Sequence, residues 1–234
     1  MRFERLKILI GEENLKKLSQ KHVAVFGVGG VGGYALEALA RSAIGEFTIV
    51  DYDTVDVTNI NRQIIATEST IGQYKTDLFE KRIKDINPEI ILHKITEKYT
   101  SLEREKFFSD YDYVVDAIDM VGSKVDLIVS CFEKNIPIIS SMGMGNRLDP
   151  SKIRITTIDR TYNCKLAKVM RRELKKHGID NLTCVFSDEI TEKSEKMLNG
   201  KKETVGSSAF VPSVAGLSIA SYIVRDFIGD TESV

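Results

Sequence analysis

A glycine-dense turn between two apolar runs constrains this chain more than any other feature of its sequence. Residues 23–26 form the first run, the turn reads GVGGVGG, and a helical pattern over residues 33–44 leads to a second run at residues 47–50. This order predicts the first half of a nucleotide-binding βαβ unit. The turn glycines that we expect near the nucleotide are Gly27, Gly29, Gly30 and Gly32.

Glycine suits such a turn because it tolerates positive φ and has no Cβ to keep a phosphate away from the backbone amides. The N-terminus of the following helix directs unpaired N–H groups and a positive dipole end toward that phosphate. Asp51 ends the second run, where its carboxylate can accept hydrogen bonds from ribose hydroxyls. By itself, this pattern most often indicates a dinucleotide cofactor.

A polar cluster after the second run favours a triphosphate instead. Arginine offers a charged fork for phosphate oxygens, and asparagine adds neutral donors. Asp119 follows a later apolar run, so we expect it at the carboxyl edge of the sheet, where it could hold Mg²⁺ against the phosphates. The residues that we expect to bind the nucleotide with the glycines are Asp51, Asp53, Asn59, Asn61, Arg62, Gln63, Lys75 and Asp119.

Several motifs in order resemble the ATP-dependent carboxylate-adenylating superfamily, which includes ubiquitin-activating enzymes and the bacterial ThiF, MoeB and HesA proteins. They are the glycine turn, the Asp51-x-Asp53 pair, NINRQ at residues 59–63, Gly72-x-x-Lys75 and DAID at residues 116–119. The match covers roughly the first 150 residues. The resemblance implies ATP as the bound nucleotide.

Length and composition are those of an ordinary enzyme. The 234 residues can bury a substantial core, and a net charge of −1 excludes a globally basic nucleic-acid binder while allowing a local basic patch. The start, MRFERLKILIG, lacks the long apolar core of a signal peptide. Residues 209–224 are apolar but carry Pro212 and serines, which favours a buried helix over a membrane-associated one. We therefore expect a cytoplasmic protein without stable membrane insertion.

Strand-like and helix-like patterns alternate along the chain. This alternation predicts an α/β fold, a Rossmann-like doubly wound and largely parallel sheet with right-handed crossovers. The predicted helices cover residues 2–18 in two parts, 33–44, 75–86, 102–108, 122–134, 163–177 and 207–228. The predicted strands cover residues 23–26, 47–50, 90–95, 113–118, 136–141, 153–158 and 183–187.

The pattern changes after residue 150, and we expect one domain over residues 1–234 with two parts. Residues 1–150 would form the nucleotide-binding core, and residues 151–234 would form an antiparallel and helical elaboration for substrate binding and dimerisation. Gly45 is expected to cap the helix over residues 33–44, and the polar residues 193–204 predict a loop.

A basic amphipathic helix is predicted over residues 163–177. Lysines and arginines there surround a single Glu173, while apolar positions supply a buried stripe. A solvated surface helix explains this pattern as well as an RNA contact surface does, in which basic side chains neutralise phosphates. The candidate RNA contacts are Lys165, Lys168, Arg171, Arg172 and Lys175.

The second half of the chain resembles one branch of the superfamily, the tRNA threonylcarbamoyladenosine dehydratases. LAKVMR at residues 166–171, VFSDE at 185–189 and FVPSVAG at 210–216 carry this resemblance. It implies that the carboxylate of a threonylcarbamoyl group on a tRNA adenosine attacks the α-phosphate of ATP. A carbamoyl nitrogen then closes a ring as AMP leaves, and no enzyme nucleophile is needed because the reacting groups share one side chain.

The resemblance also assigns roles. Arg5, Arg62, Lys75 and Asp119 would be catalytic, with Asp119 as the Mg²⁺ ligand. Arg5 would reach the phosphates in a partner subunit, which requires a homodimer; without the resemblance, a solvated helix charge explains Arg5 better. The resemblance further implies a monovalent cation (Na⁺ or K⁺) in a loop. It also implies a sulfur-relay partner of the cysteine desulfurase system. The chain has no C-x-x-C pair, so no structural zinc is expected.

The three scattered cysteines predict reduced thiols rather than a disulfide framework. Cys184 occupies a place where some superfamily members use a cysteine, but an isolated cysteine in a strand is more often a small buried apolar residue. Two other functions stay open at this point. One is activation of a ubiquitin-like sulfur-carrier protein at its C-terminus, and the other is a nicotinamide-binding or nucleotide-sensing protein without adenylation.

Overall fold

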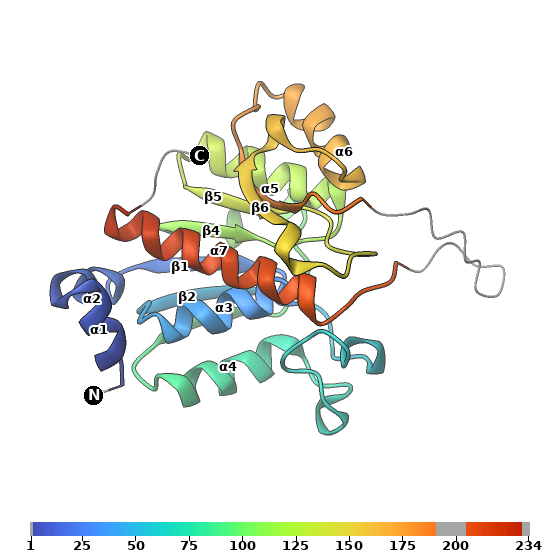
Figure 1. Ribbon diagram of the computed structural model, residues 1–234. Coiled ribbons are helices and arrows are strands. Elements are labelled where there is room, and N and C mark those ends of the chain that lie inside the picture. Colours follow the sequence, from blue (N-terminus) through green and yellow to red (C-terminus); the bar gives the residue numbers. More distant parts are fainter. Residues whose placement is uncertain (1, 191–204, 231–234) are drawn as a thin grey trace.

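The structure is a computed structural model that describes residues 2–190 and 205–230 (Figure 1). Its helices are α1 (Glu4–Ile10), α2 (Glu12–Leu18), α3 (Gly32–Arg41), α4 (Lys75–Ile86), α5 (Val121–Glu133), α6 (Lys165–Lys175) and α7 (Phe210–Ile228). Its strands are β1 (His22–Phe26), β2 (Glu46–Val50), β3 (Ile91–Ile95), β4 (Tyr113–Asp116), β5 (Ile138–Ser141), β6 (Ile153–Thr157) and β7 (Thr183–Ser187). Short 3₁₀ helices are η1 (Val57–Asn59), η2 (Glu68–Thr70), η3 (Ser101–Phe107), η4 (Pro150–Lys152) and η5 (Ile158–Arg160).

The seven strands form one sheet in the order β3-β2-β1-β4-β5-β7-β6. Every neighbouring pair is parallel except β6 and β7, which are antiparallel. The predicted Rossmann-like, largely parallel α/β fold is therefore confirmed, and the predicted antiparallel elaboration extends the same sheet. Strand order reverses direction at β1, between β2 and β4, and this is where such sheets bind ligands.

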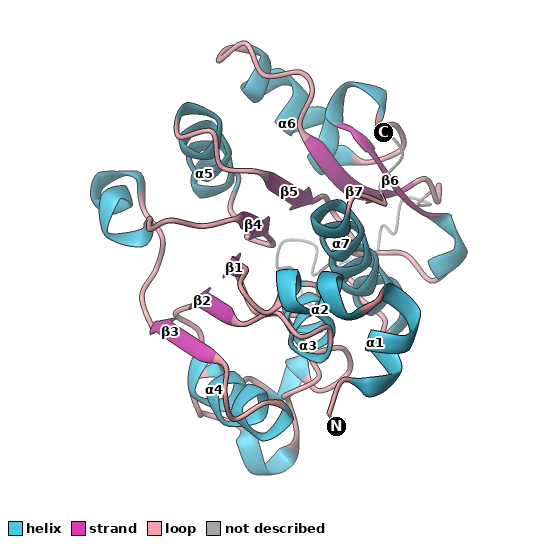
Figure 2. Ribbon diagram, turned by 90° about the vertical axis from the view of Figure 1, so that its left-hand side faces the viewer, coloured by secondary structure: helices cyan, strands magenta, loops and turns pink. Residues whose placement is uncertain are grey.

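Helices cover both faces of the sheet (Figure 2). One apolar core joins the sheet to α3, α4 and α7, and the other joins it to η3, α5 and α6. The central strand β1 is buried on both faces because odd and even side chains enter different cores: Val23 and Val25 face the first, Ala24 and Phe26 the second.

The helix α7 is the only described helix long and apolar enough to cross a membrane by length and composition. It packs against α3, and Gly216 makes this close contact possible, since a Cβ there would lie 2.3 Å from the Val31 carbonyl oxygen. Ala215, Ile219 and Ile223 are completely buried. These contacts are those of a core helix, as the sequence predicted.

Gly45 does not cap α3, and this prediction was wrong. The helix ends at Arg41, and the residue in the left-handed conformation after it is Ala43, with φ 63°. A Cβ at Gly45 would lie only 1.9 Å from the carbonyl oxygen of Ser19, which follows α2. Gly45 is needed for the close approach of two backbone segments. The loop predicted over residues 193–204 lies outside the described residues.

Candidate functional site

A cavity of about 600 Å³ opens at the carboxyl ends of β1, β2 and β4, where the strand order reverses. Its lining brings together the glycine turn, the segment after β2, the start of α4 and the turn after β4. Cavities at this point of a doubly wound sheet are the usual ligand sites. The predicted site residues that line it are Gly27, Gly29, Gly30, Asp51, Asp53, Asn59, Arg62, Gln63, Lys75 and Asp119.

The glycine turn connects β1 to α3 at the floor of this cavity. Gly27 has φ 85°, and a Cβ there would lie 2.8 Å from the Ala117 carbonyl oxygen. Gly32 does not line the cavity; a Cβ on it would lie 1.9 Å from the Gly27 carbonyl oxygen, so it closes the turn instead. No side chain caps the N-terminus of α3, which leaves the positive end of the helix dipole available to a ligand.

Asp51 ties the glycine turn to the segment after β2. One carboxylate oxygen accepts a hydrogen bond from the Val28 amide at 2.8 Å, and the other accepts from the Asp53 amide at 2.9 Å. The side chain is buried, and this burial raises the pKa of Asp51, while the charge of Lys75 and the two amides lower it. The position at the end of β2 is the one that the sequence predicted for a ribose-binding carboxylate.

The 3₁₀ helix η1 presents the polar cluster to the cavity. A capping box between Asp56 and Asn59 starts this helix, so that the Asp56 amide donates to the Asn59 amide oxygen at 3.2 Å. Arg62 donates to the Thr58 carbonyl oxygen at 2.8 Å. The buried Oε1 of Gln63 has no hydrogen-bond partner among the described residues, although the side chain lines the cavity.

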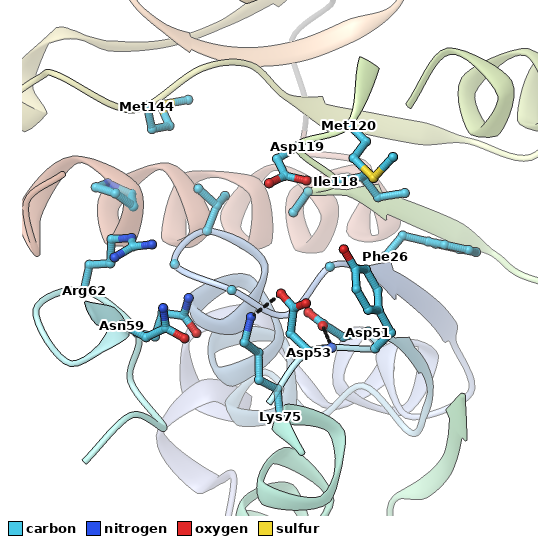
Figure 3. A pocket seen from close by; sticks show the side chains of 18 of the residues that line it. Phe26, Asp51, Asp53, Asn59, Arg62, Lys75, Ile118, Asp119, Met120 and Met144 are labelled. Carbon is cyan, nitrogen blue, oxygen red and sulfur yellow. Dashed lines mark hydrogen bonds and ion pairs between the residues drawn. The ribbon is translucent and has the colours of Figure 1, made fainter. Parts of the chain in front are cut away.

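Lys75 and Asp119 lie on opposite sides of the cavity (Figure 3). Lys75 begins α4, its side chain is buried, and its ammonium lies 2.8 Å from the Asp53 carboxylate. Asp119 enters from the turn after β4, and among the described residues its carboxylate accepts no hydrogen bond. The charge of Asp53 foremost, then burial and the charge of Asp119, raise the pKa of Tyr52, which also lines the cavity.

A completely buried ion pair supports the turn that carries Asp119, and sequence reasoning missed it. The Lys124 ammonium lies 2.9 Å from the Asp116 carboxylate and donates to the Ile118 carbonyl oxygen at 3.1 Å. Ser140 donates to the same carboxylate at 2.6 Å. A lysine within an apolar helix pattern was the available signal, because a buried charge needs a partner.

Residues 205–207 close one side of the cavity. This contribution was not predicted from the sequence. Val205, Gly206 and Ser207 line it together with Gly145. A Cβ at Gly145 would lie 2.1 Å from a Val205 methyl carbon, so any side chain there would displace Val205 where the two segments meet. Asn61 does not line the cavity; its amide donates to the Ser207 carbonyl oxygen at 2.9 Å and so holds this segment in place.

Arg5 lies far from the cavity of its own chain. It belongs to α1, at the end of the molecule opposite to the segments that line the cavity (Figure 1). Two apolar neighbours on the same helix are strongly exposed, Ile8 at 79% and Leu9 at 81%. Arg5 can therefore contribute to a site of this kind only from another copy of the chain.

The predicted basic helix is α6, on the other side of the sheet from α3 and α7. Lys165, Lys168 and Arg171 line a second cavity of about 300 Å³. Arg171 also donates to the Thr161 carbonyl oxygen at 2.7 Å, so part of its role is structural. Lys165, Lys168, Arg172 and Lys175 are exposed.

The three cysteines are all buried and unpaired. Burial raises the pKa of the Cys184 thiol to about 12, and the neighbouring Cys164 contributes to this rise. None of the cysteines lines the large cavity. A thiol in these surroundings is a poor nucleophile at neutral pH.

Comparisons with known proteins agree with this arrangement. The model of the ThiF family matches residues 3–233. A tRNA threonylcarbamoyladenosine dehydratase of Bacillus subtilis is 44% identical over 244 residues, which cover 98% of this chain and 96% of the relative. This structure also resembles the crystal structure of E. coli tRNA N6-threonylcarbamoyladenosine dehydratase, TcdA, in complex with ATP. The TM-score is 0.90 at 33% identity, and the match covers 97% of this chain and 94% of that chain. The crystal structure of TcdA in complex with AMP gives the same TM-score at 34% identity. An E. coli molybdopterin-synthase adenylyltransferase is 30% identical over 142 residues, covering 60% of this chain and 57% of the relative.

Proposed function

The chain belongs to the ThiF family, and we propose that it catalyses the ATP-dependent cyclisation of threonylcarbamoyladenosine in tRNA. The observation that carries this proposal is the cavity at the reversal point of the sheet, which holds Lys75, Arg62 and Asp119 around one space. The dehydratase relatives match this chain over almost its whole length, whereas the molybdopterin-synthase adenylyltransferase matches only part of it. This difference favours the dehydratase over the sulfur-carrier activator.

The reaction has two steps. The threonyl carboxylate attacks the α-phosphorus of ATP, and pyrophosphate leaves. A carbamoyl nitrogen then attacks the activated carbonyl carbon and AMP leaves, carrying the carboxylate oxygen that attacked phosphorus. The nitrogen releases its proton, so the cyclic product has lost one water relative to the substrate. The nitrogen and the activated carbonyl belong to the same side chain, so their effective concentration is high and ring closure is favoured.

The residues around the cavity would bind the nucleotide and neutralise its charge. Gly27, Gly29 and Gly30 would let the backbone approach a phosphate, and Asp51 would accept hydrogen bonds from the ribose. Arg62 and Lys75 would oppose the negative charge that builds on the phosphates, while Asn59 and Gln63 add neutral polar groups. Lys75 is held by Asp53 at 2.8 Å, so ATP binding would draw the ammonium from this carboxylate toward a phosphate.

The charges of the cavity fit a divalent cation. Of the described residues that line it, Asp51, Asp53, Asp56, Glu97 and Asp119 are acidic, and only Arg62, Lys75 and Lys98 are basic. A bare triphosphate would be repelled by such a lining, and oxygen ligands are those that Mg²⁺ prefers. Asp119 would hold the ion, which would supply charge neutralisation between the carboxylates and the phosphates. The monovalent cation implied by the family resemblance stays a prediction.

A homodimer would complete the site. Arg5 cannot reach the cavity of its own chain, and α1 exposes the apolar side chains of Ile8 and Leu9. At the cavity end of the molecule, α7 exposes Phe210, two residues before Pro212, which lines the cavity. Large exposed apolar side chains are typical of interaction surfaces, and pairing of these two regions in a dimer would bring Arg5 toward the phosphates in the partner subunit.

The exposed basic side chains of α6 would contact the tRNA backbone. Lys165, Lys168, Arg172 and Lys175 would neutralise phosphates, whereas Arg171 mainly anchors Thr161. A sulfur-relay partner stays a prediction, and the buried cysteines give it no support among the described residues.

The decisive experiment uses the purified protein, ATP, Mg²⁺ and tRNA that carries threonylcarbamoyladenosine. After digestion of the tRNA, mass spectrometry should detect the nucleoside that has lost one water, with AMP formed in equal amount. Unmodified tRNA should give neither product. If active, ATP-binding protein left the modified nucleoside unchanged, the dehydratase proposal would be wrong and a protein carboxylate would become the better candidate substrate.

A further inference from the structure

Two histidines and a glutamate meet at the opposite end of the sheet from the nucleotide cavity. His22 is the first residue of β1 and Glu46 is the first residue of β2, and these two residues are register partners. His93 on β3 is the register partner of Thr48, two residues beyond Glu46. Side chains alternate between the faces of a sheet, so these positions all point to the face covered by α5 and α6.

The distances suit a shared ion. The Glu46 Oε1 atom lies 2.8 Å from His93 Nε2 and 3.5 Å from His22 Nδ1. One ligand atom from each of the three residues lies within 4.8 Å of the others. Ligand atoms bound tetrahedrally at the usual zinc distances are separated by about 3.3 Å. A metal ion could therefore bind with only small side-chain movements.

Contacts on both sides hold the His22 ring in place. His22 Nε2 lies 2.9 Å from the Thr48 hydroxyl oxygen, at hydrogen-bond distance. The Tyr111 ring lies edge-on to His22 with the ring centroids 4.9 Å apart, and its hydroxyl donates to the Phe107 carbonyl oxygen at 2.8 Å. Nδ1 is therefore the ring nitrogen of His22 that faces the Glu46 carboxylate.

With Nε2 next to Thr48, His22 can offer Nδ1 to an ion that is shared with the Glu46 carboxylate and His93 Nε2. A metal-binding histidine usually donates its other ring N–H to an acceptor that fixes the ring, and the Thr48 hydroxyl oxygen would be that acceptor for His22.

We propose that His22, Glu46 and His93 bind a divalent transition-metal ion of the zinc class, with Thr48 as the residue that orients His22. Two histidines and one carboxylate are a common ligand set for such ions and leave a further position for water. The ion can enter from solvent, because the His93 side chain is 53% exposed and that of Glu46 is 32% exposed. Bound there, it would link the edge strand β3 to β1 and β2.

The test is calorimetric titration of the metal-stripped full-length protein with Zn²⁺. Excess Mg²⁺ is present to compete with Zn²⁺ for oxygen ligands in the nucleotide cavity. We expect one zinc ion per chain and a visible absorption band with Co²⁺ as a probe. His93→Ala and Glu46→Gln should each weaken zinc binding by more than about 100-fold, and Thr48→Val should weaken it by about 10- to 100-fold. Zinc should also raise the melting temperature of the wild type but not that of His93→Ala.

Two variants control this experiment. His177→Ala removes the third histidine of the chain, which is exposed and outside the cluster, and should bind zinc as the wild type does. Asp119→Asn should also keep the zinc site, because its carboxylate belongs to the nucleotide cavity. The proposal is wrong if the wild type binds no zinc, or if folded His93→Ala binds it with wild-type affinity.

Discussion

The Lys124 ammonium lies 2.9 Å from the Asp116 carboxylate, and both side chains are completely buried. Together they hold the turn after β4, from which Asp119 reaches the nucleotide cavity. Removing one partner of such a buried pair strongly destabilises the folded protein, because the remaining charge is buried without a partner and without contact with water. The position of a cavity residue thus depends on a lysine that never touches the cavity.

Replacing this lysine tests that dependence. Lys124→Met should lower the free energy of unfolding by about 3–5 kcal/mol, measured by urea denaturation, because it leaves Asp116 buried without its partner. ATP affinity should fall as well. Lys134→Met is the matched control, since Lys134 pairs with Glu105 at the surface and its loss should change stability by less than about 1 kcal/mol. A Lys124→Met protein as stable as the control would contradict the proposed support.

Lys75 and Arg62 are expected to act in adenylation and not in folding. Lys75→Ala and Arg62→Ala should each reduce pyrophosphate release by at least about 10²–10³-fold, because each removes a positive charge at the phosphates. Circular dichroism and thermal melting should show a folded protein in both cases. Lys81→Ala, at an exposed position of the same helix α4, should release pyrophosphate at the wild-type rate. Near-normal release by folded Lys75→Ala would refute the assignment.

Arg5 is expected to act in the partner subunit. Arg5→Ala alone and Lys75→Ala alone should both be nearly inactive, but mixed dimers contain one site with both residues intact. Subunit exchange at equal amounts should therefore restore about a quarter of the wild-type activity. Lys16→Ala, on the neighbouring helix α2, is the control and should by itself have wild-type activity. If mixing restores nothing although exchange is verified, Arg5 does not act across a dimer interface.

Cys184 is expected to be chemically silent in the folded protein. With its pKa raised to about 12 by burial, the thiol keeps its proton at pH 8, where the thiolate fraction is about 10⁻⁴. Native protein should react slowly with iodoacetamide at this residue, whereas unfolded protein should react quickly. Cys184→Ser should keep full dehydratase turnover. Loss of turnover in a folded Cys184→Ser protein would argue for a covalent role.

The exposed face of α6 is expected to bind tRNA through charge. Changing Lys168, Arg172 and Lys175 together to glutamate should weaken tRNA binding and reduce the slope of log affinity against log salt concentration by about 2, measured by filter binding. ATP affinity should not change. Lys16 and Lys17 on α2 and Lys81 on α4, changed together to glutamate, give the same change in net charge away from α6 and are the control. Unaltered tRNA affinity in the α6 variant would leave this helix as a solvated surface.

The sequence alone was sufficient for the order of elements and for most of the nucleotide cavity. Turn chemistry and hydrophobic periodicity are local, so the glycine turn, Asp51 at the end of β2 and Lys75 at the start of α4 were predicted at the correct places. Strand and helix ends differed by only a few residues. The exception was Gly45, because its role depends on contact with Ser19 and not on its neighbours in the chain.

Only the tertiary structure decided which distant residues meet. The meeting of His22, Glu46 and His93 depends on strand register, since these residues lie on β1, β2 and β3. The pairing of Lys124 with Asp116 depends on how α5 packs against β4, and the contact of Gly145 with Val205 joins two segments that are distant in the chain. Local patterns do not encode register, which is fixed by packing of the whole sheet. The sequence therefore determined the nucleotide motif, because each of its parts is a local pattern at the end of a strand or the start of a helix. The buried supports and the histidine cluster were decided by the fold, because only the packing of helices and strands shows which side chains meet.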